Sequence, residues 1–324
     1  MTRAIRIDRF GGCEVLIFRD VDVPEPGPGQ AIVEHGAIGL NMVDTYYRTG
    51  LYPIPLPSGL GGEAAGRVVA VGPGVEGFAA GDRVAYAAPP PLDAYSERRV
   101  IDARWLVRLP DAIADDTAAA VMLKGLTSWF LLHRSYQVRQ GDWVLLYAAA
   151  GGVGTIASQW AASLGARVIG VVGSEAKRTA ALAHGCEAVL LADDDVVAQV
   201  RDLTDGAGVP VVYDSVGRQT FFQSLDCLRP HGVMVTFGNA SGPVEPFSPA
   251  ELQKRGSLYV TRPTLFDFIR ERDQLDAGSR ALFDVISRGA VRVEIGQRYP
   301  LASVADAHRD LESRHTTGSS VLIP

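Results

Sequence analysis

The sequence predicts an α/β protein in which a mostly β first part is followed by a doubly wound parallel sheet. Short apolar runs separated by Pro-Gly turns dominate as far as about Val121. Beyond Asp142 the pattern changes to apolar strands that alternate with longer helical segments, as in βαβ units. The length of 324 residues is about twice that of a typical domain, so two domains are expected.

In the first part, strands are expected where short segments alternate in polarity or stay apolar between turns. The turns are marked by Pro24-Glu-Pro-Gly-Pro-Gly, by Val71-Gly-Pro-Gly and by Gly81-Asp-Arg. The strands predicted between them are residues 31–37, 67–71 and 83–86.

The second part contains six apolar segments of strand length, enough for a complete doubly wound sheet. Helical patterns separate them, for example at residues 153–164 and 175–183. The six predicted strands are residues 143–149, 167–172, 188–192, 210–215, 232–237 and 257–261.

The last 60 residues are predicted to return to the first domain and complete it, because they contain no phosphate-binding loop of their own. A long amphipathic helix is expected from Leu265 to Ser287. An extended segment at 291–299, a helix at 304–312 and a final strand at 320–323 follow.

The glycine-rich turn after the first strand of the parallel sheet is the strongest functional motif. Gly151, Gly152 and Gly154 lie between a strand and a helix, which is the setting of a dinucleotide-binding fingerprint. We expect Gly151 to let the backbone approach a pyrophosphate, and Gly154 to let the helix pack closely on the strand. Ala149 occupies the first glycine position, which an alanine can fill if the turn does not need a positive φ there.

The end of the second strand favours NADPH over NADH. An unmodified ribose is usually held by an acidic residue at this strand tip, but here the strand ends in Gly173-Ser174. Lys177 and Arg178 follow, and their cations suit a 2′-phosphate. Glu175 is the opposing signal, and we expect it to lie on the helix surface.

Charge and cysteine content exclude several other classes of protein. The 31 basic and 37 acidic residues give a net charge of −6 without a block of either sign, so neither nucleic acid nor a membrane surface is an expected partner. Three cysteines do not make a disulfide framework, which suits a cytoplasmic protein. The uncharged stretch 143–166 has glycines at its centre, so it is interpreted as strand, turn and helix rather than a membrane span.

Hydrolytic and metal chemistry have no motif in this chain. There is no Gly-x-Ser-x-Gly sequence for a nucleophilic serine. The six histidines are scattered, and we expect each at the surface or at a helix cap; the three cysteines are expected to be buried. Hydride transfer is the chemistry that remains.

At this point the sequence resembles the zinc-free quinone oxidoreductases of the medium-chain dehydrogenase/reductase superfamily along its whole length. The resemblance implies a GroES-like catalytic domain (residues 1–123 and 264–324), a Rossmann NADPH-binding domain (124–263) and a homodimer that reduces quinones. It rests mainly on Gly39-Leu-Asn41-Met-Val-Asp44-Thr-Tyr46, Gly61-Gly62-Glu63-Ala-Ala-Gly66, Lys124-Gly125-Leu-Thr127 and Tyr213-Asp-Ser215-Val-Gly217-Arg218.

The resemblance also implies that the protein uses no metal. Zinc-dependent relatives have a cysteine ligand where this chain has Asn41 and a histidine ligand where it has Gly62. They also carry a four-cysteine lobe that is absent here. Because a catalytic zinc needs three protein ligands, Lewis-acid alcohol oxidation is not expected.

By resemblance, the residues that line the quinone and the cofactor can be named. A flat quinone suits aromatic walls and a few hydrogen-bond donors. The catalytic set is Asn41, Asp44, Tyr46 and Tyr52. The cofactor set is Asn41, Lys124, Thr127, Gly151, Gly152, Val153, Gly154, Gly173, Ser174, Lys177, Arg178, Ser215, Phe237, Asn239, Arg262 and Arg314. Ala192 stands where the family often has a tyrosine near the adenine, so that stacking contact is in doubt.

Two alternatives remain open at this point. The first is NADPH-dependent reduction of an activated C=C bond in an enone or alkenal, which uses the same hydride geometry and needs a protonating tyrosine. The second is an NADPH-regulated protein that binds single-stranded RNA, as some relatives are described. The net charge of −6 and the lack of an aromatic and basic stripe argue against RNA binding.

Overall fold

The computed structural model describes residues 1–313 and 316–324, and the chain divides into two units. Unit 1 consists of Met1–Leu126, Ile269–Phe283 and Val293–Pro324. Unit 2 consists of Thr127–Phe268 and Asp284–Arg292. The short segment Asp284–Arg292 is therefore the main difference from the division expected from the sequence.

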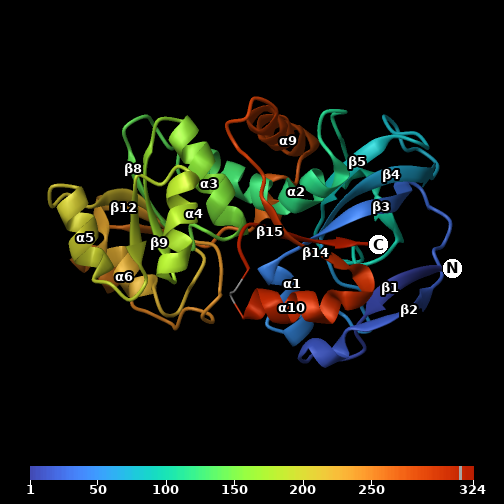
Figure 1. The fold of residues 1–324 in the computed structure, drawn as a ribbon, viewed down its shortest axis with the longest axis horizontal. Coiled ribbons are helices and arrows are strands. Elements are labelled where there is room, and N and C mark those ends of the chain that lie inside the picture. The colour runs from blue at the N-terminus through green and yellow to red at the C-terminus, as the bar shows by residue number, and fades with distance from the viewer. Residues whose placement is uncertain (314–315) are drawn as a thin grey trace. The chain divides into compact units, whose positions relative to one another are not determined.

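Unit 1 is built on a seven-stranded, mainly antiparallel sheet with the order β14-β15-β3-β4-β5-β7, in which β6 also pairs with β3 (Figure 1). A separate antiparallel pair is formed by β1 and β2. The strands are β1 (Thr2–Arg6), β2 (Ile17–Val21), β3 (Gln30–Leu40), β4 (Glu63–Val71), β5 (Arg83–Ala87), β6 (Arg98–Asp102), β7 (Val107–Arg108), β14 (Ile295–Pro300) and β15 (Ser319–Ile323).

The C-terminal segment completes the sheet of unit 1, as the sequence predicts. Strand β15 pairs antiparallel with β3 and parallel with β14. Ser320, Val321 and Leu322 face Leu40, Gly39 and Ile38 in this register. The chain end therefore lies beside the strand that leads into the first helix.

Four longer helices begin or lie in unit 1: α1 (Met42–Thr49), α2 (Asp115–Phe130), α9 (Arg272–Ser287) and α10 (Val304–Glu312). Helix α2 lies partly where the sequence suggested a mostly β region. Its residues from Ala118 to Met122 are all fully buried, so the helix lacks the one-sided apolar pattern that would have identified it. No helix within the described residues is both long and apolar enough to cross a membrane.

The single long helix predicted from Leu265 to Ser287 is wrong. The structure has a short helix α8 (Leu265–Phe268) in unit 2, followed by α9. The break falls where the chain passes from one unit to the other. Arg272 at the start of α9 donates hydrogen bonds to the carbonyls of Arg104 and Leu106, which fixes this helix end within unit 1.

Unit 2 contains a six-stranded parallel sheet with the order β10-β9-β8-β11-β12-β13, and all six strands predicted from the sequence are present. The fold class is confirmed. The strands are β8 (Trp143–Tyr147), β9 (Arg167–Val172), β10 (Ala188–Leu191), β11 (Val209–Asp214), β12 (Leu228–Thr236) and β13 (Tyr259–Thr261).

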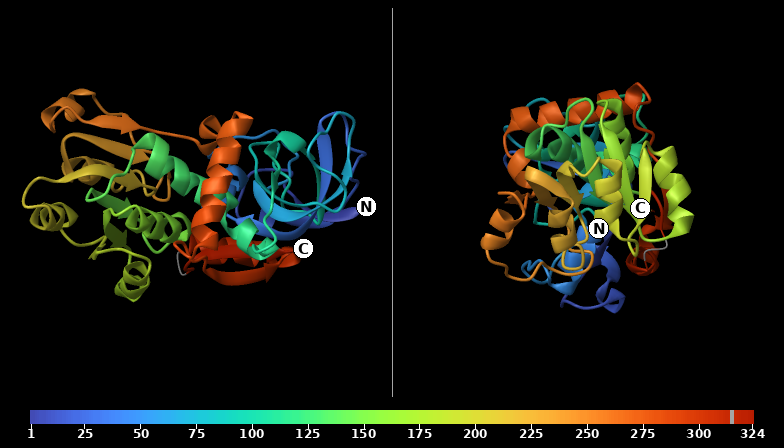
Figure 2. Two further views of the ribbon diagram at one scale, coloured as in Figure 1. Left: turned by 90° about the horizontal axis from the view of Figure 1, so that it is seen from above. Right: turned by 90° about the vertical axis from the view of Figure 1, so that its left-hand side faces the viewer.

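The strand order reverses at β8, because the chain first extends the sheet through β9 and β10 and then continues on the other side with β11. Right-handed crossovers therefore place helices on both faces. Figures 1 and 2 show α3 (Gly152–Ser163) and α4 (Arg178–Ala183) together on one face, with α5 (Val196–Leu203) and α6 (Phe221–Asp226) on the other. The helix α7 (Ala250–Lys254) precedes β13. Such a reversal opens a ligand-binding crevice at the carboxyl ends of the strands.

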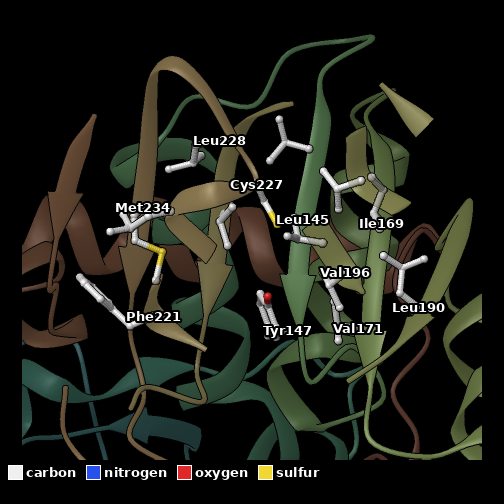
Figure 3. Close-up of a cluster of buried hydrophobic side chains, with 14 of the residues drawn as sticks. Leu145, Tyr147, Ile169, Val171, Leu190, Val196, Phe221, Cys227, Leu228 and Met234 are labelled. Carbon is white, nitrogen blue, oxygen red and sulfur yellow. The ribbon is translucent and has the colours of Figure 1, made fainter. Parts of the chain in front are cut away.

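An apolar core between this sheet and its helices holds the carboxyl ends in place (Figure 3). Leu145 and Ile169 come from the neighbouring strands β8 and β9, while Val196 and Phe221 come from helices α5 and α6. All four are at most 1% exposed. Burial of each such side chain stabilises the fold by about 1.5–3 kcal/mol.

Candidate functional site

The glycine-rich turn connects β8 to α3. Gly151 is the residue before the helix, its backbone is extended, and no side chain caps the helix start. An exposed helix start without a side-chain cap offers its N–H groups to an anion. The turn therefore has the local structure that a pyrophosphate requires.

Gly154 sits in the first turn of α3 against the end of β8. A Cβ atom at this position would collide with the carbonyl oxygen of Ala148 and lie 2.7 Å from the Cα of Ala149. Both neighbours are backbone atoms, which cannot move without separating the helix from the strand. The close packing expected for this glycine is therefore seen in the structure.

We expect Gly154→Ala to destabilise the protein by about 1–3 kcal/mol, the usual cost of overpacking. Urea denaturation of the full chain measures this change. Gly173→Ala is the matched control, because a Cβ there meets nothing within 4 Å and should leave the midpoint unchanged. Equal midpoints for the two variants would contradict the packing argument.

The turn places its strained residue one position earlier than the motif suggests. Ala148 has φ of 54°, in the left-handed region, whereas Ala149 does not have a positive φ. This explains why an alanine is tolerated at the first glycine position of the fingerprint. Ala149 also donates its N–H to the carbonyl of Val171 (3.1 Å), which ties the turn to β9.

The end of β9 presents Gly173 and Ser174, which are both exposed. Lys177 lies half-buried in the turn that follows. The guanidinium of Arg178 is held by the protein itself: it pairs with Glu175 at 2.8 Å and donates to the carbonyl of Val189. Glu175 is thus turned toward Arg178 on the surface, as expected. Arg314 lies outside the described residues.

A buried carboxylate, Asp214, shapes the ends of β11 and β12, and the sequence reasoning missed it. Its two oxygens accept hydrogen bonds from the N–H groups of Val216 and Gly217 (2.7 and 3.1 Å) and from the hydroxyls of Thr220 and Ser224 (2.6 and 2.8 Å). The side chain is fully buried. Asp214 therefore fixes the loop that begins at Ser215, which is expected to contact the cofactor.

The remaining residues of unit 2 that are expected to contact the cofactor gather at the same edge of the sheet. A Cβ on Gly238 would collide with the carbonyl oxygen of Ser215, so the ends of β11 and β12 approach closely. Phe237 and Asn239 flank this glycine, and Arg262 donates to the carbonyl of Thr236 at 2.8 Å. Thr127 is buried on α2. The structure thus brings the residues after β8, β9, β11, β12 and β13 to one sheet edge.

In unit 1, Asn41, Glu63 and Lys124 form a buried polar cluster. One oxygen of Glu63 accepts from the Asn41 amide (2.7 Å) and from the Lys124 ammonium (2.8 Å). The other accepts from the backbone N–H of Leu123. Glu63 is fully buried, and a Cβ on Gly39 would collide with its carboxylate, so the cluster is tightly packed. Asn41 and Lys124 are therefore held by Glu63.

Asp44 lies in the first turn of α1, fully enclosed beside this cluster. It accepts hydrogen bonds from the N–H of Asn41 (2.9 Å) and from the hydroxyl of Tyr95 (2.8 Å). Burial raises the pKa of Asp44 to about 7, although both hydrogen bonds lower it. Glu63 raises this pKa further and Lys124 lowers it. Asp44 is thus a buried carboxyl group whose pKa lies well above that of an ordinary aspartate.

Tyr46 and Tyr52 face each other at the two ends of a reversal in the chain. Helix α1 ends at Gly50, which has φ of 81°, so the chain turns back and the N–H of Tyr52 donates to the carbonyl of Tyr46 (3.1 Å). Their rings meet edge to face, with centroids 5.4 Å apart. Both are half-buried, as suits an aromatic wall for a flat ligand.

The residues at the position of the zinc site do not fit a zinc ion. Asn41 donates its amide to Glu63, and Gly62 has no side chain. Glu63 is already paired with the ammonium of Lys124, which would repel a cation. Across the described residues there is no cluster of three or more His, Cys, Asp or Glu side chains that could hold a metal.

Sequence reasoning also missed Tyr95 and His308, which are both fully buried. The expectation of surface or capping histidines is wrong for His308 and His35, each at most 5% exposed, whereas His184 is buried but stands at the C-cap of α4. A single tyrosine or histidine carries no local sequence signal that it will be buried in a polar contact. Glu63 did carry one, because an acidic residue followed by Ala-Ala-Gly in a buried strand needs a partner.

Two family models match this chain. Residues 27–111 match the alcohol dehydrogenase GroES-like domain, and residues 152–273 match the zinc-binding dehydrogenase domain. The first range lies in unit 1 and most of the second lies in unit 2.

Individual proteins resemble the chain over its whole length. It is 52% identical to a quinone oxidoreductase of Pseudomonas aeruginosa and 43% identical to a 2-haloacrylate reductase of Burkholderia sp., with at least 99% of each chain covered. The crystal structure of Escherichia coli quinone oxidoreductase complexed with NADPH superimposes with a TM-score of 0.97 at 47% identity, covering 99% of this chain and 100% of the other. The protein therefore belongs to the quinone oxidoreductase family of the medium-chain dehydrogenases/reductases.

Proposed function

We propose that this protein catalyses the NADPH-dependent reduction of quinones without a metal. The observation that carries the proposal is the turn from Gly151 to Gly154 at the strand-order reversal, in a chain 52% identical to a quinone oxidoreductase. The resemblance of the fold to a quinone oxidoreductase complexed with NADPH supports the choice of cofactor.

Residues of unit 2 would hold the cofactor at the carboxyl edge of the sheet. The N–H groups at the start of α3 suit the pyrophosphate, and the open space at Gly173 suits the ribose end. Ser174 and Lys177 would receive the 2′-phosphate, with Arg178 and Arg314 as further candidates. The other expected contacts are Thr127, Ser215, Phe237, Asn239 and Arg262 of unit 2, and Asn41 and Lys124 of unit 1.

Residues of unit 1 would bind the quinone. Tyr46 and Tyr52 supply aromatic surface, while Asn41 and Asp44 lie at the start of the helix that carries Tyr46. Bound NADPH supplies a hydride, and formation of the hydroquinone consumes one proton in addition. The protein contributes mainly positioning and exclusion of water.

Steady-state oxidation of NADPH with 1,4-benzoquinone and with naphthoquinones tests the proposal. We expect turnover with at least one of them, unaffected by a metal chelator. Absence of turnover with every quinone, in a preparation that binds NADPH, would refute quinone reduction.

A second candidate is reduction of an activated C=C bond, favoured by the 43% identity to a 2-haloacrylate reductase. Both reactions deliver a hydride to an electron-poor π-system conjugated with a carbonyl or carboxylate, and both products take up one proton. Comparison of kcat/KM for quinones, 2-alkenals and 2-chloroacrylate separates them. Higher values for the alkenes than for every quinone would favour the second candidate.

The preference for NADPH can be tested at Gly173, where a Cβ atom meets nothing within 4 Å among the described residues and φ is not positive. Gly173→Asp places a carboxylate where the 2′-phosphate is expected, so NADPH should bind about tenfold or more weakly because of charge repulsion. Gly173→Asn is the matched control for size. Fluorescence titration with NADPH and NADH measures both, and equal losses with Asp and Asn would contradict the proposed phosphate site.

We also propose that the protein is a cytoplasmic homodimer with its catalytic domain at residues 1–123 and 264–324 and its cofactor domain at 124–263. The three cysteines form no disulfide, which suits a reducing compartment. Strand β13 is an end strand of the parallel sheet, and its Tyr259 is 62% exposed, as suits pairing with a second copy. Light scattering of the purified protein tests the dimer.

A further inference from the structure

A chain of buried side chains connects Asp44 to Arg48 through two residues from distant parts of the sequence. Arg48 contacts Nδ1 of His308 (3.0 Å), Nε2 of His308 contacts the hydroxyl of Tyr95 (3.1 Å), and this hydroxyl contacts Asp44 (2.8 Å). All four side chains are at most 2% exposed. Water therefore does not interrupt the chain.

The hydrogen bonds along this chain have a fixed direction. A guanidinium can only donate, so Nδ1 of His308 must accept and Nε2 must carry the proton. Nε2 then donates to the oxygen of Tyr95, which leaves the Tyr95 hydroxyl to donate to Asp44. Burial and Arg48 lower the pKa of His308 to about 3, so the ring stays neutral and keeps this tautomer.

A second buried histidine–tyrosine pair in unit 1 runs in the opposite direction. Nδ1 of His35 faces the carbonyl of Ser96 (2.7 Å), so it carries the proton and Nε2 accepts from the hydroxyl of Tyr86 (2.8 Å). Here the tyrosine donates to the histidine and no carboxylate is attached. The direction of the Tyr95 chain is therefore imposed by Arg48.

The charges around Asp44 leave its carboxylate without a matched cation. Arg48 pairs with Glu312 (2.6 Å) and Lys124 pairs with Glu63 (2.8 Å). The charges that act on Asp44 are those of Glu63 and Lys124, while Tyr95 and the backbone of Asn41 act on it through hydrogen bonds; Asp44 in turn acts on Tyr47. Both neighbouring cations are thus paired with carboxylates other than Asp44.

We propose that Tyr95, His308 and Arg48 are positioning residues that control the protonation of Asp44, and that this protonation sets the pH dependence of quinone reduction. The inference rests on the proposed function. Hydride transfer to a quinone produces a hydroquinone anion, which takes up one proton. A protonated Asp44 favours this anion, whereas an ionised Asp44 repels it, so activity falls as the pH rises through the pKa of Asp44.

The direction of the effect of Tyr95 follows from its hydrogen bond. The Tyr95 hydroxyl stabilises ionised Asp44, and its removal raises the pKa of Asp44. Tyr95→Phe should therefore move the alkaline limb of the plot of log(kcat/KM) against pH to a pH higher by about 1 unit. This is the shift expected from loss of one hydrogen bond to a charged group.

The experiment measures kcat/KM for 1,4-benzoquinone from pH 5 to pH 10 at saturating NADPH. Tyr86→Phe is the matched control, because it removes a buried tyrosine–histidine hydrogen bond without contact to Asp44. Its alkaline limb should coincide with that of the parent. His308→Gln retains a donor toward Tyr95, so its limb should also stay within about 0.3 pH units of the parent.

A second measurement keeps the two proposals separate. NMR titration of the ¹³C-labelled Asp44 carboxyl, assigned with Asp44→Asn, reports its pKa without any turnover. An unchanged carboxyl pKa in Tyr95→Phe, or equal shifts in Tyr95→Phe and Tyr86→Phe, would overturn the positioning role. A shifted carboxyl pKa with an unshifted activity limb would overturn the link to catalysis. Absence of any quinone turnover in the parent would refute the proposed function instead.

Discussion

Replacement of Lys124 with methionine is expected to destabilise the protein by about 3–5 kcal/mol. Methionine has a similar length, but it leaves the carboxylate of Glu63 without its cation. Glu63 is fully buried and cannot turn to water, and its hydrogen bonds from Asn41 and Leu123 are neutral. Urea denaturation of the full chain measures the loss, and hydrogen exchange of peptides from β4 locates it.

Two further variants test the cause of this loss. The double variant Glu63→Gln, Lys124→Met removes both charges, so it should recover most of the lost stability. Lys254→Met removes a lysine from an exposed pair with Glu251 that has the same 2.8 Å distance. It should change stability by less than about 1 kcal/mol. A double variant no better than Lys124→Met would show that packing, not the uncompensated charge, causes the loss.

Asp44→Asn is expected to stabilise the protein above neutral pH. Below about pH 4 Asp44 is protonated in both folded and unfolded chains, so its titration adds nothing. Between pH 4 and pH 7 the unfolded chain releases the proton and the folded protein retains it, so the parent loses stability. The shift of about three pH units corresponds to at most about 4 kcal/mol, fully developed above pH 7. Asparagine does not titrate and avoids this loss.

Denaturation midpoints at pH 5, 6, 7 and 8.5 measure the effect. The stability of Asp44→Asn relative to the parent should rise from pH 5 to pH 7 and level off toward pH 8.5. Asp82→Asn is the control of opposite sign, because a backbone N–H and Arg108 lower the pKa of Asp82. Its stability relative to the parent should stay constant from pH 5 upward. A constant difference for Asp44→Asn would mean that Asp44 is ionised throughout.

The parallel sheet was predictable because each of its strands is a local apolar run between turns. The turn from Gly151 to Gly154 was predictable for the same reason, since strand, glycines and helix are contiguous. Helix α2 was not identified as such, because its buried residues surround it instead of forming one face. The break between α8 and α9 depends on the passage between units, which leaves no periodic signal.

The candidate site was predictable only where its residues follow one another along the chain. Asn41, Asp44 and Tyr46 lie in one short motif and come together on one helix. Tyr95 and His308 join Asp44 from 51 and 264 positions away, so only the folded sheet brings them into contact. Likewise, the sequence does not show that Arg178 contacts Glu175 and the carbonyl of Val189, which the structure does.

The burial of Lys124 has a practical consequence for covalent labelling. The chain has only three lysines, so amine-directed reagents address few positions. Lys124 is 5% exposed and is shielded by Glu63. Lys254 is exposed, and in the sequence it lies far from the glycine turn. If Lys177, half-buried after β9, binds the 2′-phosphate as proposed, NADPH should slow its labelling relative to that of Lys254, which serves as an internal reference.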